Sequence, residues 1–245
     1  MERTVGLRNL LNGQEMTADT RTWLISQLKG LILIGVMSLI LSAGANMFRM
    51  DPIPWVEKRR LLKAGDRFPY VPLSAPEVPG LREYLGIPPG KEVVTIVDVQ
   101  AELLVIEVLN VFCFPCQSQS LALNKAYKMI EARPDLKDRI KIIGVALGNT
   151  KEVSEGFAKD YGLAFPVIPD RELRTEKIIG PGIHTPFSLF VRRDASGKLG
   201  LVAGTHEGPI EDPQVLFDGL LTLLKTEPGA VNLDELFRNG SSPGL

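Results

Sequence analysis

Apolar and polar positions change their spacing several times along the chain, and each change marks a predicted element. Two runs rich in branched apolar residues, 92–99 and 103–112, are typical of strands, and the QAE sequence between them can close a hairpin. The second run is predicted to be central and buried. After Pro115 the apolar residues recur at helical spacing, which predicts a helix that ends near Arg133.

The rest of the chain continues this alternation. The stretch 64–92 holds too many prolines for a long helix or a central strand, so it is predicted to be a looped entry with short edge pieces. Alternation followed by a hairpin predicts an α/β fold, with a mixed sheet and helices on both faces. The later strands are expected over 140–147, 186–193 and 200–206, with a short extended piece over 165–170. The later helices are expected over 149–162, 171–179 and 212–225.

The N-terminal region has the pattern of an export signal. No charged residue occurs over 30–48, the most apolar part is 31–41, and Lys29 precedes it. Ala43 and Ala45 follow in the small-residue arrangement of a cleavage site. The run is also just long enough to cross a bilayer once, so a retained anchor stays open beside a cleaved signal, with a buried soluble helix as the third alternative.

These patterns divide the chain into a signal peptide or membrane anchor (1–45), a stem (46–62), an α/β domain (63–225) and a loose C-terminal tail (226–245). On either export interpretation the domain lies outside the cytoplasm, in the periplasm or on the outer face of the membrane, anchored or secreted. The 245 residues are 44% hydrophobic, which suits one domain with a substantial core. A net charge of −1 without a basic run argues against a nucleic-acid partner.

Cys113 and Cys116 are the two cysteines of the chain, three positions apart. A structural zinc site needs four ligands and there is no second pair, while a disulfide across so short a loop stabilises little. The pair follows a predicted strand, and Pro115 suits the first turn of a helix. Free N–H groups at a helix N-terminus favour a thiolate at Cys113. We therefore expect a redox pair without metal or other cofactor, in which Cys113 attacks and Cys116 resolves.

This arrangement resembles the thioredoxin fold, and within it the exported TlpA/ResA-like thiol-disulfide oxidoreductases of the redoxin superfamily. The resemblance covers roughly 63–225. The segments that carry it are AGDRFP (64–69), CFPC (113–116), GLAFPVIPD (162–170) and GIHTPFSLFV (182–191). It implies a thioredoxin-like mixed sheet and an activity on protein thiols and disulfides.

The resemblance also implies roles for residues around the cysteines. Pro186 occupies the place of a cis-proline that packs against the disulfide, and the backbone of Thr185 would pair with an extended substrate segment. Two positions depart from the family pattern. Phe112 replaces a common tryptophan, and Phe114 is bulkier than the usual residue between Cys113 and Pro115. Phe112, Phe114, Pro115, Thr185 and Pro186 are therefore candidate substrate contacts.

Glu107 is an acid inside an apolar strand, six residues before Cys113. Thioredoxins have a buried aspartate at that spacing, which accepts the proton of the second cysteine. By the period of two, Glu107 shares a face with Val105 and Leu109. One hypothesis is that burial raises its pKa so that it exchanges a proton with Cys116; the other is a glutamate at an edge, facing solvent.

Three functions stay open. The leading one is an exported oxidoreductase that reduces disulfides, supplied with electrons by a membrane-borne donor. A peroxiredoxin is the second, although neither cysteine has the P-x-x-x-T-x-x-C context. The third is a copper-handling assembly factor with Cys113, Cys116 and His184 as soft ligands. His184 can alternatively tune the thiols or lie in solvent, and His206 is expected to be structural or exposed.

Overall fold

A five-stranded mixed sheet forms the centre of the fold in the computed structural model, which describes residues 18–47 and 60–239. The strand order is β5-β4-β3-β6-β7, so β3 is the middle strand. β3 runs parallel to β4 and β4 parallel to β5, while β6 and β7 form an antiparallel hairpin beside β3. The strands are β3 Leu103–Leu109, β4 Ile140–Leu147, β5 Val167–Asp170, β6 Phe187–Arg193 and β7 Leu199–Glu207.

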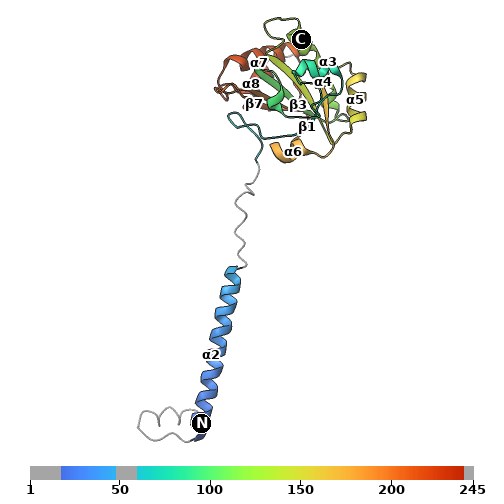
Figure 1. Cartoon of the computed structure of the whole chain (residues 1–245). Helices are drawn as coiled ribbons and strands as arrows, with labels where there is room; N and C mark the ends of the chain where they lie inside the picture. Colours follow the sequence, from blue (N-terminus) through green and yellow to red (C-terminus); the bar gives the residue numbers. More distant parts are fainter. Residues whose placement is uncertain (1–17, 48–59, 240–245) are drawn as a thin grey trace. The chain divides into compact units, whose positions relative to one another are not determined.

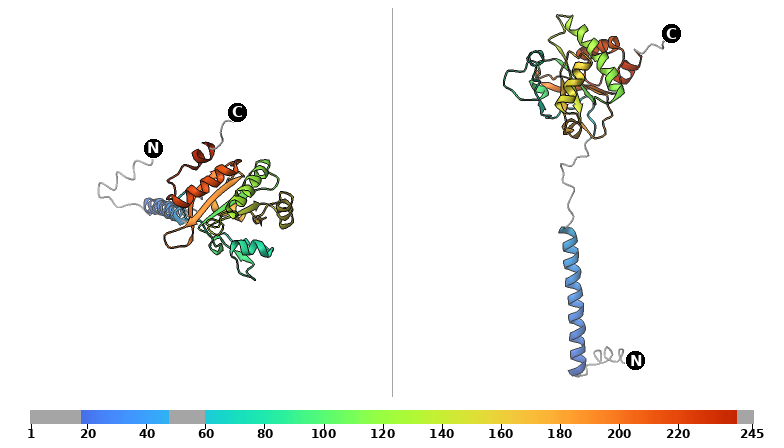
Figure 2. Two further views of the ribbon diagram at one scale, coloured as in Figure 1. Left: turned by 90° about the horizontal axis from the view of Figure 1, so that it is seen from above. Right: turned by 90° about the vertical axis from the view of Figure 1, so that its right-hand side faces the viewer.

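Helices cover both faces of this sheet, which confirms the predicted fold class. On one face α4 and α7 lie side by side, as the views of Figures 1 and 2 agree, and they bury apolar side chains against β3. On the other face α3, α6 and the segment before β3 cover the alternate side chains of β3. The helices of this unit are α3 Pro79–Leu85, α4 Phe114–Glu131, α5 Lys151–Asp160, α6 Arg174–Ile179, α7 Pro213–Lys225 and α8 Leu233–Asn239.

The sequence at the helix ends explains where these helices begin. Cys113 is the N-cap of α4 and has an extended backbone, and Pro115 lies in the first turn, where no N–H is needed. The Thr150 side chain accepts from the backbone N–H of Val153 at the start of α5. Asp212 caps α7 through the N–H of Gln214 at 2.8 Å. The predicted helices over 115–133, 149–162 and 212–225 are thus confirmed within a few residues.

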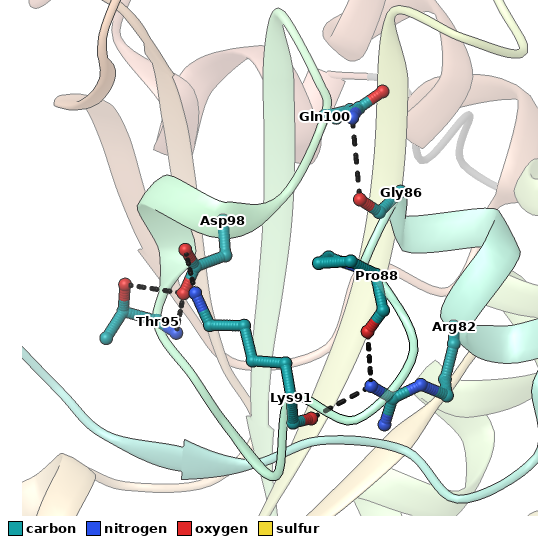
Figure 3. A network of polar contacts seen from close by, with 7 residues as sticks. All are labelled: Arg82, Gly86, Pro88, Lys91, Thr95, Asp98 and Gln100. Atoms are coloured by element: carbon teal, nitrogen blue, oxygen red, sulfur yellow. Dashed lines mark hydrogen bonds and ion pairs between the residues drawn. The ribbon is translucent and has the colours of Figure 1, made fainter.

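The predicted strand over 92–99 is wrong for most of its length. Only Val93–Val94 (β2) forms a strand, and it pairs with β1 (Leu73–Ser74) in a separate two-stranded sheet. Ile96–Asp98 forms a turn of 3₁₀-helix, because Thr95 and Asp98 cap one another's backbone. Lys91 holds Asp98 in place through an ion pair of 2.6 Å, as Figure 3 shows. These polar contacts outweigh the preference of the branched residues for a strand.

Residues 226–239 differ from the predicted loose tail. Helix α8 packs on β7 and α7, with Leu233 and Phe237 both buried. Gly204 of β7 and Gly219 of α7 leave the room for these two side chains, since a Cβ at either glycine would collide with them. The sequence has one small apolar patch there, at 231–237, which is too short to predict a packed helix. Residues 240–245 lie outside the described residues.

The chain divides into two units, residues 1–57 and 58–245. Within the first, the structure describes one helix, α2 (Ala18–Met47), and the apolar side chains placed along 25–37 are exposed. Among the described residues, no helix combines the length and the apolar character that crossing a membrane requires. Residues 1–17 and most of the predicted stem lie outside the described residues, and the predicted division at 45 and 62 stays a prediction.

Candidate active site

Cys113 stands where β3 has ended and α4 begins. The connecting residues are held in place from two strands. The Asn110 side chain donates to the carbonyl of Leu147 at 3.0 Å and accepts from the N–H of Phe112 at 2.9 Å. The Asn149 side chain, after β4, accepts from the N–H of Val111 at 3.1 Å. Two amides thus fix the turn that presents Cys113, which is half-buried at the N-terminus of α4.

Cys116 lies one turn further into α4 and is fully buried beside Leu109, Val111 and Phe157. Both cysteines are free thiols in this structure. Burial first, and then a hydrogen bond with the Cys113 side chain, raise the pKa of the Cys116 thiol to about 12. Cys116 therefore keeps its proton at neutral pH unless a base takes it.

The loop before β6 approaches the pair from across the sheet. The peptide bond between Thr185 and Pro186 is cis, as the resemblance implied. The thiol of Cys113 donates to the carbonyl oxygen of Thr185 at 3.4 Å. Pro186 is buried and Thr185 is half-buried, so the loop leaves backbone atoms of Thr185 next to the sulfur.

Glu107 is completely buried on β3, so the solvent-facing alternative is wrong. It shares a face with Val105 and Leu109, on the side that α4 covers. The Ser188 hydroxyl donates to Oε2 of Glu107 at 2.6 Å, and the amide of Gln119 lies 3.4 Å from the same oxygen. Burial raises the pKa of Glu107 to about 7, and these two hydrogen bonds limit the rise.

No hydrogen bond joins Glu107 to either cysteine among the contacts of the described residues. Its role as the proton acceptor for Cys116 therefore stays a prediction. Burial raises the pKa of Glu107 to about 7, and its side chain lies on the strand that leads into the cysteine turn, on the face that α4 covers.

Gln119 and Ser188 are the polar partners that the sequence analysis missed. Gln119 lies one turn beyond Cys116 on α4, and Ser188 is the cross-strand neighbour of Glu107 on β6. Both are buried. A glutamine in the polar run QSQS gives no sign of facing inward, and the pairing of Ser188 with Glu107 depends on the register of two strands far apart in the sequence.

The remaining candidates separate into two groups. Phe112 is 78% exposed and Phe114 is 77% exposed, on either side of Cys113 in the sequence, and Pro115 is exposed as well. His184 is also exposed, and among the described residues no hydrogen bond or ion pair of its side chain is found. His206, expected to be structural or exposed, is buried on β7 and bonds Asp234 at 3.1 Å, which makes it structural.

In the part of the chain that the structure describes, no three His, Cys, Asp or Glu side chains come close enough to hold a metal ion. His184 therefore does not join Cys113 and Cys116 as a ready-made ligand set.

Comparison with known proteins gives a partial sequence match. The chain is similar to the thiol-disulfide oxidoreductase ResA of Geobacillus thermodenitrificans, with 26% identity over 110 residues. The match covers 44% of this chain and 58% of that protein, so it spans little more than half of the relative's length. No protein-family model matches. The match supports the predicted resemblance to ResA-like proteins.

Two solved structures are also similar to this chain. One is a putative thiol:disulfide interchange protein DsbE from Chlorobium tepidum, at 21% identity over 67% of this chain and 99% of that one, with a TM-score of 0.48. The other is StoA from Bacillus subtilis, at 21% identity over 52% and 87%, with a TM-score of 0.41. Since these scores are low, the thioredoxin-like assignment rests on the strand order, the cysteine turn and the cis-proline loop of this chain itself.

Proposed function

We propose that the protein is a thiol-disulfide oxidoreductase that acts on protein disulfides through Cys113 and Cys116. The observation that carries this is the asymmetry of the pair: Cys113 is partly accessible at a helix N-terminus, and Cys116 is buried one turn behind it. An accessible thiol in such a place attacks, and a covered neighbour resolves. The sequence similarity to a protein named thiol-disulfide oxidoreductase supports the same activity.

The reaction proceeds by two exchanges. The Cys113 thiolate attacks one sulfur of a substrate disulfide, which forms a mixed disulfide and releases the other sulfur as a thiolate. Cys116 then loses its proton, and its sulfur attacks the Cys113 sulfur. The second substrate thiolate leaves, so two electrons pass to the substrate and the Cys113–Cys116 disulfide remains. The reaction needs no other cofactor, and a dithiol donor returns the pair to the reduced form.

Glu107 takes the proton of Cys116 in this scheme. Because the pKa of Glu107 is about 7, part of the population is ionised at neutral pH and can accept a proton inside the fold. The thiol of Cys116, with its raised pKa, needs such a base. A water molecule between the two groups, or a movement of Cys116, would complete the path.

The substrate binds at the surface formed by Phe112, Phe114 and Pro115, with the Thr185–Pro186 loop beside it. Two aromatic side chains this exposed next to a reactive thiol suit an unfolded or extended segment with apolar residues around its cysteine. In this proposal the carbonyl oxygen of Thr185, which lies 3.4 Å from the Cys113 sulfur, accepts a hydrogen bond from the backbone of that segment.

The direction of transfer is proposed to be reduction, outside the cytoplasm and with a membrane-borne electron donor. The uncharged run over 30–48 with Ala43 and Ala45 supports export, since a cleaved signal needs only a short apolar stretch. The N-terminal sequence of the mature native protein tests this: a start shortly after Ala45 supports a cleaved signal. An intact N-terminus together with a cytoplasmic location would contradict export.

Trapping of the mixed disulfide tests the activity. With Cys116→Ser, a peptide disulfide should remain attached to Cys113 and be seen by mass spectrometry as a stable adduct. With Cys113→Ser, the buried Cys116 should form the adduct at least about 100-fold more slowly. Equal labelling of the two variants would contradict the assigned roles.

A further inference from the structure

The side-chain amide of Gln119 lies between β3, β6 and the loop before α7. One contact determines the direction in which its oxygen and its nitrogen point. The backbone N–H of Ile210 donates to Oε1 of Gln119. A backbone N–H can only donate, so the amide oxygen must face Ile210 and the NH₂ group must face the other way. On that side Nε2 lies 3.4 Å from Oε2 of Glu107 and 3.4 Å from the Ser188 oxygen.

The two oxygens of Glu107 consequently differ. Oε2 accepts from the Ser188 hydroxyl at 2.6 Å and from the Gln119 amide at 3.4 Å. Oε1 is buried as well, and it has no hydrogen-bond partner among the described residues. A carboxyl oxygen that already accepts two hydrogen bonds is a poor site for a proton, whereas Oε1 keeps its lone pairs free.

We propose that Gln119 is a positioning residue that, together with Ser188, makes Oε1 of Glu107 the atom that takes up and releases the proton. The use of that proton by Cys116 rests on the proposed function; the assignment to Oε1 does not. In the resolving step the Cys116 proton moves to Oε1, and the Cys116 sulfur attacks Cys113. The donors on Oε2 stay in place throughout, so the buried polar groups need no rearrangement.

The surroundings of Glu107 leave few other groups to compete for this proton. Its partner across β3 and β4 is Gly144, which has no side chain, and its partner on β6 is Ser188. Cys116 lies near the start of α4, whereas Lys125, Tyr127, Lys128 and Glu131 lie in its C-terminal half, and Lys141 of β4 and Arg192 and Arg193 of β6 lie toward the other ends of their strands. On β7, His206 stands opposite Ser188 and bonds Asp234, and Glu207 follows it. The remaining side chains that α4 and α7 bury on this face are mostly apolar.

Direct titration of Glu107 tests the positioning role of Gln119. The chemical shift of the ¹³C-labelled side-chain carboxyl would be followed with pH in the reduced, full-length protein, and the signal identified by its loss in Glu107→Gln. Gln119→Met removes the NH₂ donor at nearly the same volume. We expect the titration midpoint of Glu107 to rise by about one pH unit, because the ionised form loses a hydrogen bond.

Asn124→Leu is the matched control. Asn124 is a buried amide on the same helix that also bridges two backbone groups, the Gly162 carbonyl and the Ala164 N–H, each at 2.9 Å. Neither of these bonds involves Glu107, so the titration midpoint of Glu107 should not change in Asn124→Leu. A second variant, Gln119→Glu, keeps an acceptor for the Ile210 N–H and replaces the donor by a carboxyl group. It should raise the midpoint further than Gln119→Met does.

An unchanged midpoint in both Gln119 variants would overturn the proposal, and so would an equal rise in Asn124→Leu. The outcome is separate from that of the proposed function. A wild-type protein that forms no mixed disulfide, with a midpoint that still rises in Gln119→Met, would refute the oxidoreductase activity and leave the positioning role standing.

Discussion

The Cys113 thiol donates a hydrogen bond of 3.4 Å to the carbonyl oxygen of Thr185, which lies 72 residues further along the chain. This bond exists only while the sulfur carries its proton. The contact places a backbone carbonyl oxygen beside the sulfur that we propose attacks the substrate disulfide. A carbonyl oxygen has two lone pairs, so Thr185 can also accept from the backbone N–H of a substrate segment in the proposed complex.

Replacing Glu107 by glutamine should slow the resolving step and change its dependence on pH. In the wild-type protein the release of substrate from the mixed disulfide should accelerate as pH rises through about 7, where Glu107 ionises. Glu107→Gln cannot accept the Cys116 proton, and the rate should fall about 100-fold. Single-turnover release of a fluorescent thiol measures this step. A variant with the wild-type rate and pH profile would remove Glu107 from the mechanism.

The free energy of unfolding should fall as pH rises from about 4.5 to about 7. Between these values the folded protein holds a proton on Glu107 that the unfolded chain has lost, because burial raises the pKa in the fold. Unfolding then releases a proton, and higher pH favours it. The loss is roughly 3 kcal/mol in total, in proportion to the change in pKa.

Urea unfolding of the reduced protein at several pH values measures this loss. Glu107→Gln should flatten the curve between pH 5 and 7 relative to wild type. Glu102→Gln is the control, since Arg139 lowers the pKa of Glu102 and its pairing therefore affects stability at lower pH. The pH 5–7 decline should persist in Glu102→Gln. Its persistence in Glu107→Gln instead would show that another group causes it.

The sequence was sufficient to predict the elements that have a long apolar pattern. It was insufficient to predict contacts between residues that are far apart in the chain. The strand 140–147 was located to the residue, because its apolar run has clear boundaries. Glu107 was expected on the face of Val105 and Leu109, because side chains on a strand alternate. Its burial could be established only from the structure, in which α4 covers that face. Nothing local to Gln119 or Ser188 indicates that they meet Glu107, since register and helix rotation decide it.

The C-terminal segment shows that packing contacts between distant residues are equally hard to predict from the sequence. The helix α8 has apolar residues at two positions that matter, Leu233 and Phe237, and their pockets are made by glycines in β7 and α7. A pocket that depends on an absent side chain elsewhere in the chain leaves no periodic signal. The strand prediction for 92–99 was wrong for the opposite reason, because a local contact decides the structure there. The capping hydrogen bonds between Thr95 and Asp98 outweigh the strand preference of the apolar residues.

Phe237→Ala should destabilise the domain by about 3 kcal/mol, although the residue lies close to the C-terminus of the chain. Its ring is buried against Phe190 and His206 and fills the space above Gly219. Phe112→Ala is the matched control, since that ring is exposed and its loss should change stability by less than about 0.5 kcal/mol. Urea unfolding compares the two, and equal stabilities would contradict the packing of α8.

Phe114→Ala should lower the rate of exchange with peptide disulfides whose cysteine is flanked by apolar residues by about tenfold. The exposed ring would otherwise contact these residues while Cys113 attacks. The control is in the substrate: a peptide with small polar flanking residues should react equally with both proteins. Second-order rate constants from stopped-flow measurements give the comparison. An equal loss with both peptides would mean that Phe114 acts on the thiol and not on substrate choice.

The equilibrium of the Cys113–Cys116 pair with glutathione tests the central claim most directly. The full-length protein would be equilibrated in buffers of defined reduced and oxidised glutathione, and the fraction in the disulfide form counted by alkylation and mass spectrometry. We predict a reversible two-electron transition with a potential near that of thioredoxin, about −270 mV, as for a reductant. A pair that never forms the disulfide at any ratio would contradict the account.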